Sequence, residues 1–454
     1  MLGHLFAVAA AFVPSPQRPP NIVQIVADDL AYDDLSCYGC ADIATPNLDR
    51  LAQRGMRFTS FYAPHSTCTP TRAALMTGSY AQRVSLPNVL FPNSTVGLAD
   101  SEVTIAELLR ERGYATACIG KWHLGHLPQF LPVKHGFDSF FGIPCPNDHG
   151  PERLDKNGAT RGFPSIPLMQ GLEVVEQPAQ LASCPERFTA EAVRFIEEHR
   201  ERPFFLHFSN IETHTPWLVA REYQYRSKAG VYGDAVASFD ASVGRIVDAL
   251  ERTGLAGQTL IVVSSDNGPL VHQYPELEGI YGHAATVDTS RKHALREGKY
   301  QSRYEGGTRV FCIASWPGRI AERRTSDALV AGFDWYPTFA ALAGASVPAD
   351  RIVDGHDLAP LLFGTEPAPP VRDSLAFYEG ARLVAVRWKE WKLVLRDKRN
   401  ELYDLSTDLA EARDVAAEHS DVVGRMGELA QRYRADLGDA GTAGSGVRAC
   451  GKAP

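Results

Sequence analysis

Short and nearly continuous apolar runs recur along the chain, and each of them ends in polar residues. The runs cover residues 21–27, 115–120, 203–209 and 259–265. Runs of this length with apolar side chains on both faces are typical of strands buried in a parallel sheet. We therefore expect these four segments to be buried strands of a mostly parallel sheet.

Helical patterns alternate with these runs. The first helix is predicted over residues 45–55, with Thr45 as its N-cap and Gly55 as its stop. A capping box formed by Thr104 and Glu107 predicts the start of a second helix, and residues 236–254 form a third. The alternation predicts the α/β class: a sandwich with a large, mostly parallel central sheet flanked by helices.

The pattern changes towards the C-terminus. Residues 383–405 alternate apolar and polar positions, as antiparallel strands do, and residues 420–437 form a charged helix. We expect a main domain over residues 21–372 and a smaller C-terminal α+β subdomain with an antiparallel sheet over residues 373–437. The segment 438–454 is rich in Gly and Ala and is predicted to be a flexible tail.

Polar side chains follow all four apolar runs. They are Asp28 and Asp29, Lys121 and His123, His214, and Asp266 and Asn267. Each signal alone is weak, because Asp and Asn often cap helices and turns. Ligands of open α/β sheets bind beyond the carboxyl ends of the strands. Four strands that end in such groups are therefore better explained by one site than by four caps.

Four of these residues offer only oxygen atoms: Asp28, Asp29, Asp266 and Asn267. Oxygen ligands suit Ca²⁺ or Mg²⁺, whereas zinc prefers nitrogen and sulfur. The alternative hypothesis is that each pair caps a helix or turn. Further along, residues 295–310 carry several basic side chains that either serve an anion site or lie on the surface.

The charge and the apolar runs of the chain limit the kinds of partner that it is expected to bind. The 454 residues carry a formal net charge of −8, which gives no basic footprint for nucleic acid. No run reaches the roughly 18 apolar residues of a membrane span, so we expect no membrane partner. Residues 1–20 are interpreted as a signal peptide or leader, which favours a periplasmic or secreted protein over a cytoplasmic one. The eight cysteines are scattered and do not form a disulfide framework.

One cysteine lies in a distinctive context. Cys68, Pro70 and Arg72 have the spacing C-x-P-x-R at the start of a predicted helix. The dipole and free N–H groups of a helix N-terminus favour anions, and we expect them to lower the pKa of the Cys68 thiol. A nucleophile, a metal ligand, half of a disulfide and a precursor of another group all stay open at this point.

These motifs together resemble the sulfatase family, that is, the formylglycine-dependent, arylsulfatase A-like enzymes. The family signature C-x-P-x-R-x-x-L-x-T-G is matched by Cys68, Pro70, Arg72, Leu75, Thr77 and Gly78. The blocks "NIVQIVADDL", "GKWHLG", "SSDNGP" and "YEGGTRV" are similar to family blocks in the same order, from about residue 21 to beyond residue 415. The resemblance implies an alkaline-phosphatase-like fold.

The resemblance also implies a role for each candidate residue. Cys68 would be oxidised to formylglycine by a formylglycine-generating or anaerobic maturation enzyme, and its hydrate would be the nucleophile. A Ca²⁺ ion, or Mg²⁺, would be bound by Asp28, Asp29, Asp266, Asn267 and residue 68. The remaining roles are sulfate contact and leaving-group assistance for His214 and Lys299, base for His123, and diol binding for Arg72 and Lys121.

The chain departs from the family pattern between the "GK" and "GG" pairs, where it has one extra residue. Lys299 is therefore the preferred sulfate ligand, and Arg303 is the alternative. The expected activity is hydrolysis of sulfate monoesters, exo-acting on a sulfated saccharide, with aryl sulfates as surrogate small-molecule substrates. A phosphonate monoester hydrolase or phosphodiesterase on the same fold stays an alternative, and an oligomer stays open.

Overall fold

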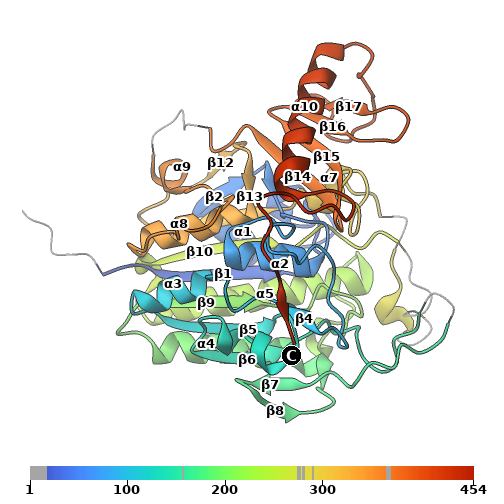
Figure 1. Cartoon of the computed structure of the whole chain (residues 1–454). Coiled ribbons are helices and arrows are strands. Elements are labelled where there is room, and N and C mark those ends of the chain that lie inside the picture. Colours follow the sequence, from blue (N-terminus) through green and yellow to red (C-terminus); the bar gives the residue numbers. More distant parts are fainter. Residues whose placement is uncertain are drawn as a thin grey trace, which may run out of the picture.

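The computed structural model describes residues 18–155, 158–272, 278, 282–288, 291–364 and 370–453. Its largest feature is a ten-stranded sheet in the order β12-β2-β11-β10-β1-β9-β5-β6-β7-β8 (Figure 1). The central strands run parallel, and antiparallel pairs lie towards both edges. This confirms the predicted α/β class with a mostly parallel centre.

The four apolar runs are the neighbouring strands β10, β1, β9 and β5 at the centre of this sheet. Their register is continuous, so the carboxyl ends of all four strands lie at one edge. The bounds of the strands are β1 (Asn21–Ala27), β2 (Gly55–Phe58), β5 (Ala115–Lys121), β6 (Ser139–Ile143), β7 (Leu168–Gln170), β8 (Glu173–Glu176), β9 (Phe204–Ser209), β10 (Thr259–Ser265), β11 (Cys312–Ser315) and β12 (Arg324–Ser326).

Helices cover both faces of the sheet. Along β1, Ile22 and Val26 face one hydrophobic core, and Val23 and Ile25 face the other, as the period of a strand requires. The first core is closed by α2 (Cys68–Thr77), α3 (Ile105–Glu111), α8 (Trp335–Leu342) and α9 (Ala359–Phe363). The second core is closed by α1 (Pro46–Gln53), α4 (Cys184–Glu198) and α5 (Gly230–Arg252).

The N-termini of α3 and α1 are capped in different ways. The capping box of Thr104 and Glu107 at α3 is present, as predicted. Thr45 is the N-cap residue of α1, as predicted, but its side chain makes no capping hydrogen bond. The Asp240 carboxylate of α5 instead accepts hydrogen bonds from the Asn47 and Leu48 backbone N–H groups, because packing brings α5 against α1.

A four-stranded antiparallel sheet, in the order β14-β15-β16-β17, and α10 (Ser420–Leu437) form a C-terminal unit. Figure 1 shows this unit, in orange to red, at the top of the main body. Its strands are β14 (Ser374–Glu379), β15 (Arg382–Trp388), β16 (Trp391–Val394) and β17 (Glu401–Asp404). The short elements β3 (Phe61–Tyr62), β13 (Val330–Ala331) and α7 (Glu305–Thr308) complete the main body.

The segment after α10 differs from the flexible tail that composition suggested. It runs back along the main body to pair β18 (Gly451–Lys452) with β4 (Val96–Gly97) in antiparallel register (Figure 1). Arg448 forms two charged hydrogen bonds, of 2.7 and 3.0 Å, with Glu102. Gly444 lies so close to α10 that a Cβ there would be 2.2 Å from the Asp436 carbonyl oxygen. The glycines therefore permit close packing here instead of mobility.

Arg83 joins the main body to the C-terminal unit. Its guanidinium is 1% exposed and lies 2.7 Å from carboxylate oxygens of both Asp354 and Asp436. We expect Arg83→Ala to lower the free energy of unfolding by about 3 kcal/mol, because two carboxylates lose their buried partner. Urea denaturation measures this. Arg382→Ala is the matched control, since the Arg382–Asp397 pair is exposed and should contribute less than about 0.5 kcal/mol. Equal losses in both variants would contradict the prediction.

Residues 1–17, which include most of the expected leader, lie outside the described residues. Within the described part of the chain, no helix combines the length and the apolar character that a membrane crossing needs. All eight cysteines are free thiols; Cys37 lies in a short 3-10 helix over Ser36–Tyr38, and Cys40 follows it in a loop.

Candidate active site

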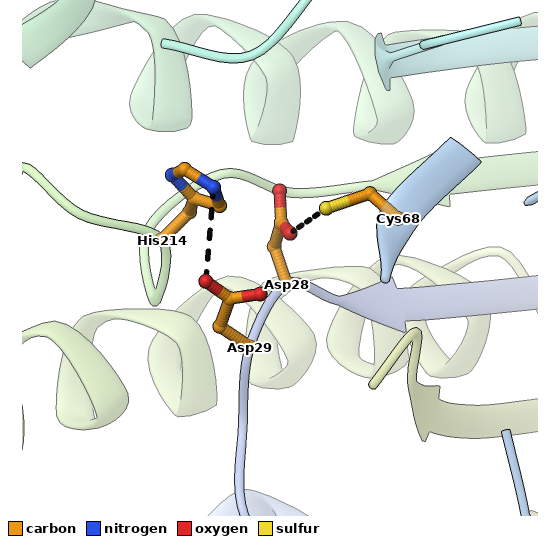
Figure 2. Close-up of side chains that lie close together, drawn as sticks. All are labelled: Asp28, Asp29, Cys68 and His214. Carbon is orange, nitrogen blue, oxygen red and sulfur yellow. Dashed lines mark hydrogen bonds and ion pairs between the residues drawn. The ribbon is translucent and has the colours of Figure 1, made fainter. Parts of the chain in front are cut away.

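The carboxyl edge of the central strands brings the predicted residues together. Asp28 and Asp29 follow β1, Lys121 ends β5, and Asp266 and Asn267 follow β10. Cys68 is the first residue of α2, and His214 lies in the loop after β9. Figure 2 shows Asp28, Asp29, Cys68 and His214 pointing toward one another. All of these side chains are buried.

The Cys68 thiol donates to Asp28 Oδ1 over 3.6 Å, and Cys68 is only 2% exposed. Burial raises the pKa of the thiol, and the carboxylates of Asp266 and Asp28 add to this, although Lys121 and Lys299 oppose it. The prediction that the helix N-terminus lowers this pKa is therefore wrong. The physical reason is that desolvation disfavours the thiolate more than the helix dipole favours it. The encoded cysteine is thus a neutral thiol.

The oxygen-rich part of the site fits a divalent cation. Ligand atoms of Asp28, Asp29, Cys68 and His214 lie within 4.8 Å of one another. Asn267 donates through Nδ2 to Asp29 Oδ1 over 2.7 Å, while its buried Oδ1 has no hydrogen-bond partner among the described residues. A buried amide oxygen beside carboxylates is the kind of ligand that Ca²⁺ and Mg²⁺ take. The donor set therefore matches the cation expected from the sequence.

Asp266 belongs to the same cluster. Its Oδ1 accepts from the Asp29 backbone N–H over 3.2 Å, and its Oδ2 accepts from Arg72 Nη2 over 2.8 Å. Burial and the adjacent Asp28 carboxylate raise the pKa of Asp266. For Asp28 burial acts in the same direction, but Lys121, His214 and Arg72 together hold its pKa well below the usual range. The two carboxylates therefore do not bind protons equally.

Three buried cations balance the three aspartates. Lys121 Nζ lies 2.6 Å from Asp28 Oδ2, and Lys299 Nζ lies 2.6 Å from Asp29 Oδ2. Arg72 also donates to the Lys121 carbonyl oxygen over 2.9 Å and to the Ser209 hydroxyl. This positive charge, concentrated in an acidic protein, creates a local environment that suits an anionic group.

His123 is held as a neutral imidazole. Burial and the Lys121 charge lower its pKa well below the usual value. Its Nε2 lies 2.8 Å from the Leu90 carbonyl oxygen, which fixes the proton on Nε2. Nδ1 is buried without a hydrogen-bond partner among the described residues and is left as a proton acceptor. This arrangement can serve as a general base.

His214 has the opposite arrangement. Its Nδ1 lies 2.6 Å from the Thr215 carbonyl oxygen, so Nδ1 carries the proton, and Nε2 faces Lys299 Nζ at 3.0 Å. Burial and the Lys299 charge lower the pKa of His214. The Lys299–His214 pair thus places an N–H donor and a neutral imidazole at one side of the cluster.

The two candidate sulfate ligands of the 295–310 segment, Lys299 and Arg303, lie in different environments. Lys299 lies within the cluster, whereas Arg303 is 23% exposed and pairs over 3.3 Å with Glu379 of the C-terminal unit. Tyr300 adopts a positive φ of 72°, and its N–H donates to the Ser66 carbonyl oxygen over 2.9 Å. This hydrogen bond ties the backbone next to Lys299 to the segment that precedes Cys68.

Sequence reasoning missed several supporting groups. The Leu90 carbonyl that orients His123 is a backbone atom and carries no signal in the sequence. Thr213 accepts from the Asp28 N–H and donates to the Asp28 carbonyl oxygen. Gly120 does carry a signal, because a Cβ there would lie 1.9 Å from the Ser209 carbonyl oxygen, so close approach requires glycine.

Comparisons with known proteins identify sulfatases as relatives of this chain. The sulfatase family model matches residues 20–345, and a model of the C-terminal part of N-sulphoglucosamine sulphohydrolase matches residues 297–435. The chain is 43% identical to human arylsulfatase A over 391 residues, covering 82% of this chain and 73% of that protein. It is 38% identical to dog N-acetylgalactosamine-6-sulfatase over 396 residues, covering 83% and 71%.

Solved structures share the fold. The structure of Ps i-CgsB in complex with k-i-k-neocarrahexaose has a TM-score of 0.78 and 30% identity, covering 92% of this chain and 93% of that chain. A phosphonate monoester hydrolase of Agrobacterium radiobacter has a TM-score of 0.63 and 21% identity, covering 91% and 94%, which shows a likeness of fold alone.

Proposed function

The chain belongs to the sulfatase family and is a sulfuric ester hydrolase, and we propose that it removes sulfate from a saccharide by exo action. The observation that carries the sulfate-ester chemistry is the position of Cys68. It starts α2 and lies 3.6 Å from Asp28, among three buried cations and an oxygen-rich cluster. The relative named N-acetylgalactosamine-6-sulfatase and the neighbour bound to k-i-k-neocarrahexaose support a saccharide substrate.

We propose that Cys68 is the precursor of formylglycine, formed by a formylglycine-generating or anaerobic maturation enzyme. The neutral, buried thiol supports this, because a catalytic thiolate needs a lowered pKa. The hydrated aldehyde supplies two hydroxyl groups on one carbon, one to attack sulfur and one to release the sulfate afterwards. Arg72 and Lys121 supply the positive charge that holds this residue in place.

Asp28, Asp29, Asp266 and Asn267 are the residues that would hold Ca²⁺, or Mg²⁺. When bound, the ion supplies Lewis-acid polarisation of the oxygens around it and neutralises charge on the sulfate group. The buried, unpartnered Asn267 Oδ1 supports this assignment.

The proton transfers are divided between the Lys299–His214 pair and His123. Lys299 Nζ carries the proton of the pair and is placed to bind the sulfate and to give a proton to the leaving alcohol oxygen, while His214 Nε2, 3.0 Å away, holds Lys299 in position. His123 Nδ1 is the acceptor that takes the proton of the second hydroxyl, since its Nε2 is engaged by Leu90.

The proposal is tested with protein co-expressed with a formylglycine-generating enzyme. Sulfate release is measured from para-nitrophenyl sulfate and from a panel of sulfated monosaccharides, with phenyl phosphonate esters assayed in parallel. Turnover of sulfate esters is expected. Turnover of a phosphonate ester without release of sulfate from any substrate would overturn the proposal and favour a phosphonate monoester hydrolase.

We expect Lys299→Ala to lower kcat/KM by roughly 100-fold or more, because a charged donor to the transferring group is lost. Arg303→Ala is the matched control, since its partner is Glu379 outside the cluster, and kcat/KM should stay within about threefold of the wild-type value. Steady-state kinetics on para-nitrophenyl sulfate measure both variants. A larger loss for Arg303→Ala than for Lys299→Ala would reverse the assignment.

A further inference from the structure

The loop after β6 places a second group of polar side chains beside the cluster. Asn147 Nδ2 donates to the carbonyl oxygens of His214 and Pro216 over 3.3 and 3.4 Å. The His149 ring lies 5.9 Å from the His123 ring, edge to face. The loop is therefore fixed against both histidines of the active site, His123 and His214.

Three atoms of this loop lack hydrogen-bond partners. Asn147 Oδ1, Asp148 Oδ1 and His149 Nδ1 are buried without one among the described residues. The residues themselves are 2%, 8% and 5% exposed. Asp148 Oδ1 lies 3.8 Å from His149 Nε2, which is too long for a hydrogen bond. Buried polar atoms are normally paired by protein, water or ligand, so three together beside a reaction centre point to a ligand.

The charge of the group defines which ligand chemistry fits. Burial alone would raise the pKa of Asp148, but His149, His214 and Arg153 hold it well below the usual range, so the carboxylate is ionised. Arg153 Nη1 lies 3.1 Å from Asp148 Oδ2, which leaves Oδ1 facing away from this partner. Burial lowers the pKa of His149 to about 3, so this imidazole is neutral.

An ionised carboxylate, an amide oxygen and a neutral imidazole nitrogen form a set rich in hydrogen-bond acceptors. Such a set pairs with hydroxyl or amide N–H donors and repels a further anionic group. Next to it, the half-buried Phe91 ring lies 4.9 Å from the His149 ring and stacks on Phe163 at 5.7 Å. Aromatic rings give an apolar wall against which the C–H face of a sugar packs.

We propose that Asp148, together with Asn147 and His149, binds the hydroxyl or amide N–H groups of a neutral sugar ring whose sulfate ester is cleaved. The proposal rests on the proposed function and names the part of the substrate on the leaving-group side. It implies discrimination against rings that carry a carboxylate or a second sulfate next to the scissile ester, because Asp148 would repel them.

The test compares two substrates on the Asp148→Asn variant of the full-length, matured enzyme. The substrates are the sulfated monosaccharide of the panel that the wild type cleaves best and para-nitrophenyl sulfate, which has no hydroxyl groups. We expect kcat/KM to fall roughly 10- to 100-fold further on the saccharide than on the aryl sulfate, because only the sugar donates to the carboxylate. His149→Gln is a second variant and should shift the same ratio in the same direction.

Asp100→Asn is the matched control, since it makes the same chemical change at an exposed position and should leave the ratio as in the wild type. Thermal unfolding reports whether each variant is folded. An equal loss on both substrates, or no loss on the saccharide, would overturn the proposal. Wild-type turnover of the aryl sulfate without cleavage of any saccharide would also overturn it. Turnover of neither sulfate would instead overturn the proposed function.

Discussion

Replacing Cys68 with alanine is expected to reduce turnover by at least about 10⁴-fold while the fold is retained, because in the proposed mechanism the nucleophile is made from this side chain. Cys68 is 2% exposed, and the hydrogen bond from its thiol to Asp28 is long, at 3.6 Å, so alanine removes little packing. Cys68→Ser should react once and then stall, because it lacks the second hydroxyl. Kinetics on para-nitrophenyl sulfate and mass spectrometry of the sulfated serine peptide measure these outcomes.

Cys184→Ala is the matched control. Cys184 also starts a helix, α4, and is fully buried, but the sequence around it lacks the C-x-P-x-R spacing. This variant should keep wild-type turnover, and the Cys184 peptide should keep its thiol. The peptide that holds residue 68 should be about 18 Da lighter than the encoded one after maturation. Wild-type activity of Cys68→Ala would refute the nucleophile assignment.

The second large effect is expected for Asp266→Ala, which should lower Ca²⁺ affinity and kcat/KM together, each by roughly 100-fold or more. The reason is twofold: the variant loses a carboxylate of the cluster and leaves the Arg72 guanidinium, 2.8 Å from Asp266 Oδ2, without this partner. Metal content of the purified protein and activity against Ca²⁺ concentration measure the two losses.

Thermal unfolding with and without a chelator gives an independent readout. A bound ion stabilises the folded state, so a chelator should lower the Tm of the wild type more than that of Asp266→Ala. Asp240→Ala serves as the control, because this buried carboxylate caps α1 and should affect stability without changing metal content. Full Ca²⁺ occupancy and normal activity of Asp266→Ala would contradict the assignment.

Much of the architecture follows from patterns a few residues long. The apolar runs predict the four central strands, and each run ends at the residues that the structure brings to one edge of the sheet. The capping box at α3 forms as predicted because both of its partners lie within one helical turn. The C-x-P-x-R motif places Cys68 at a helix start for the same local reason.

Other features depend on residues that are distant in the sequence, and there the local pattern was not sufficient. Thr45 is the N-cap residue of α1 as predicted, but the capping hydrogen bond is accepted by Asp240, because packing of two helices brings Asp240 there. The glycine-rich tail is held by β4 and Glu102, which lie far from it in the sequence. The pKa of Cys68 rises because desolvation in the folded protein outweighs the helix dipole that the local sequence supplies.

The sequence by itself determined the four central strands, the starts of α2 and α3, and which residue types stand at the ends of the strands, because these depend on periodicity and short-range contacts. Only the tertiary structure decided that Lys299 faces the cluster and Arg303 faces Glu379, and that the Asn147 amide contacts the His214 carbonyl oxygen. Contacts and electrostatic environments of this kind arise between segments that are distant in sequence, and they exist only once the chain has packed.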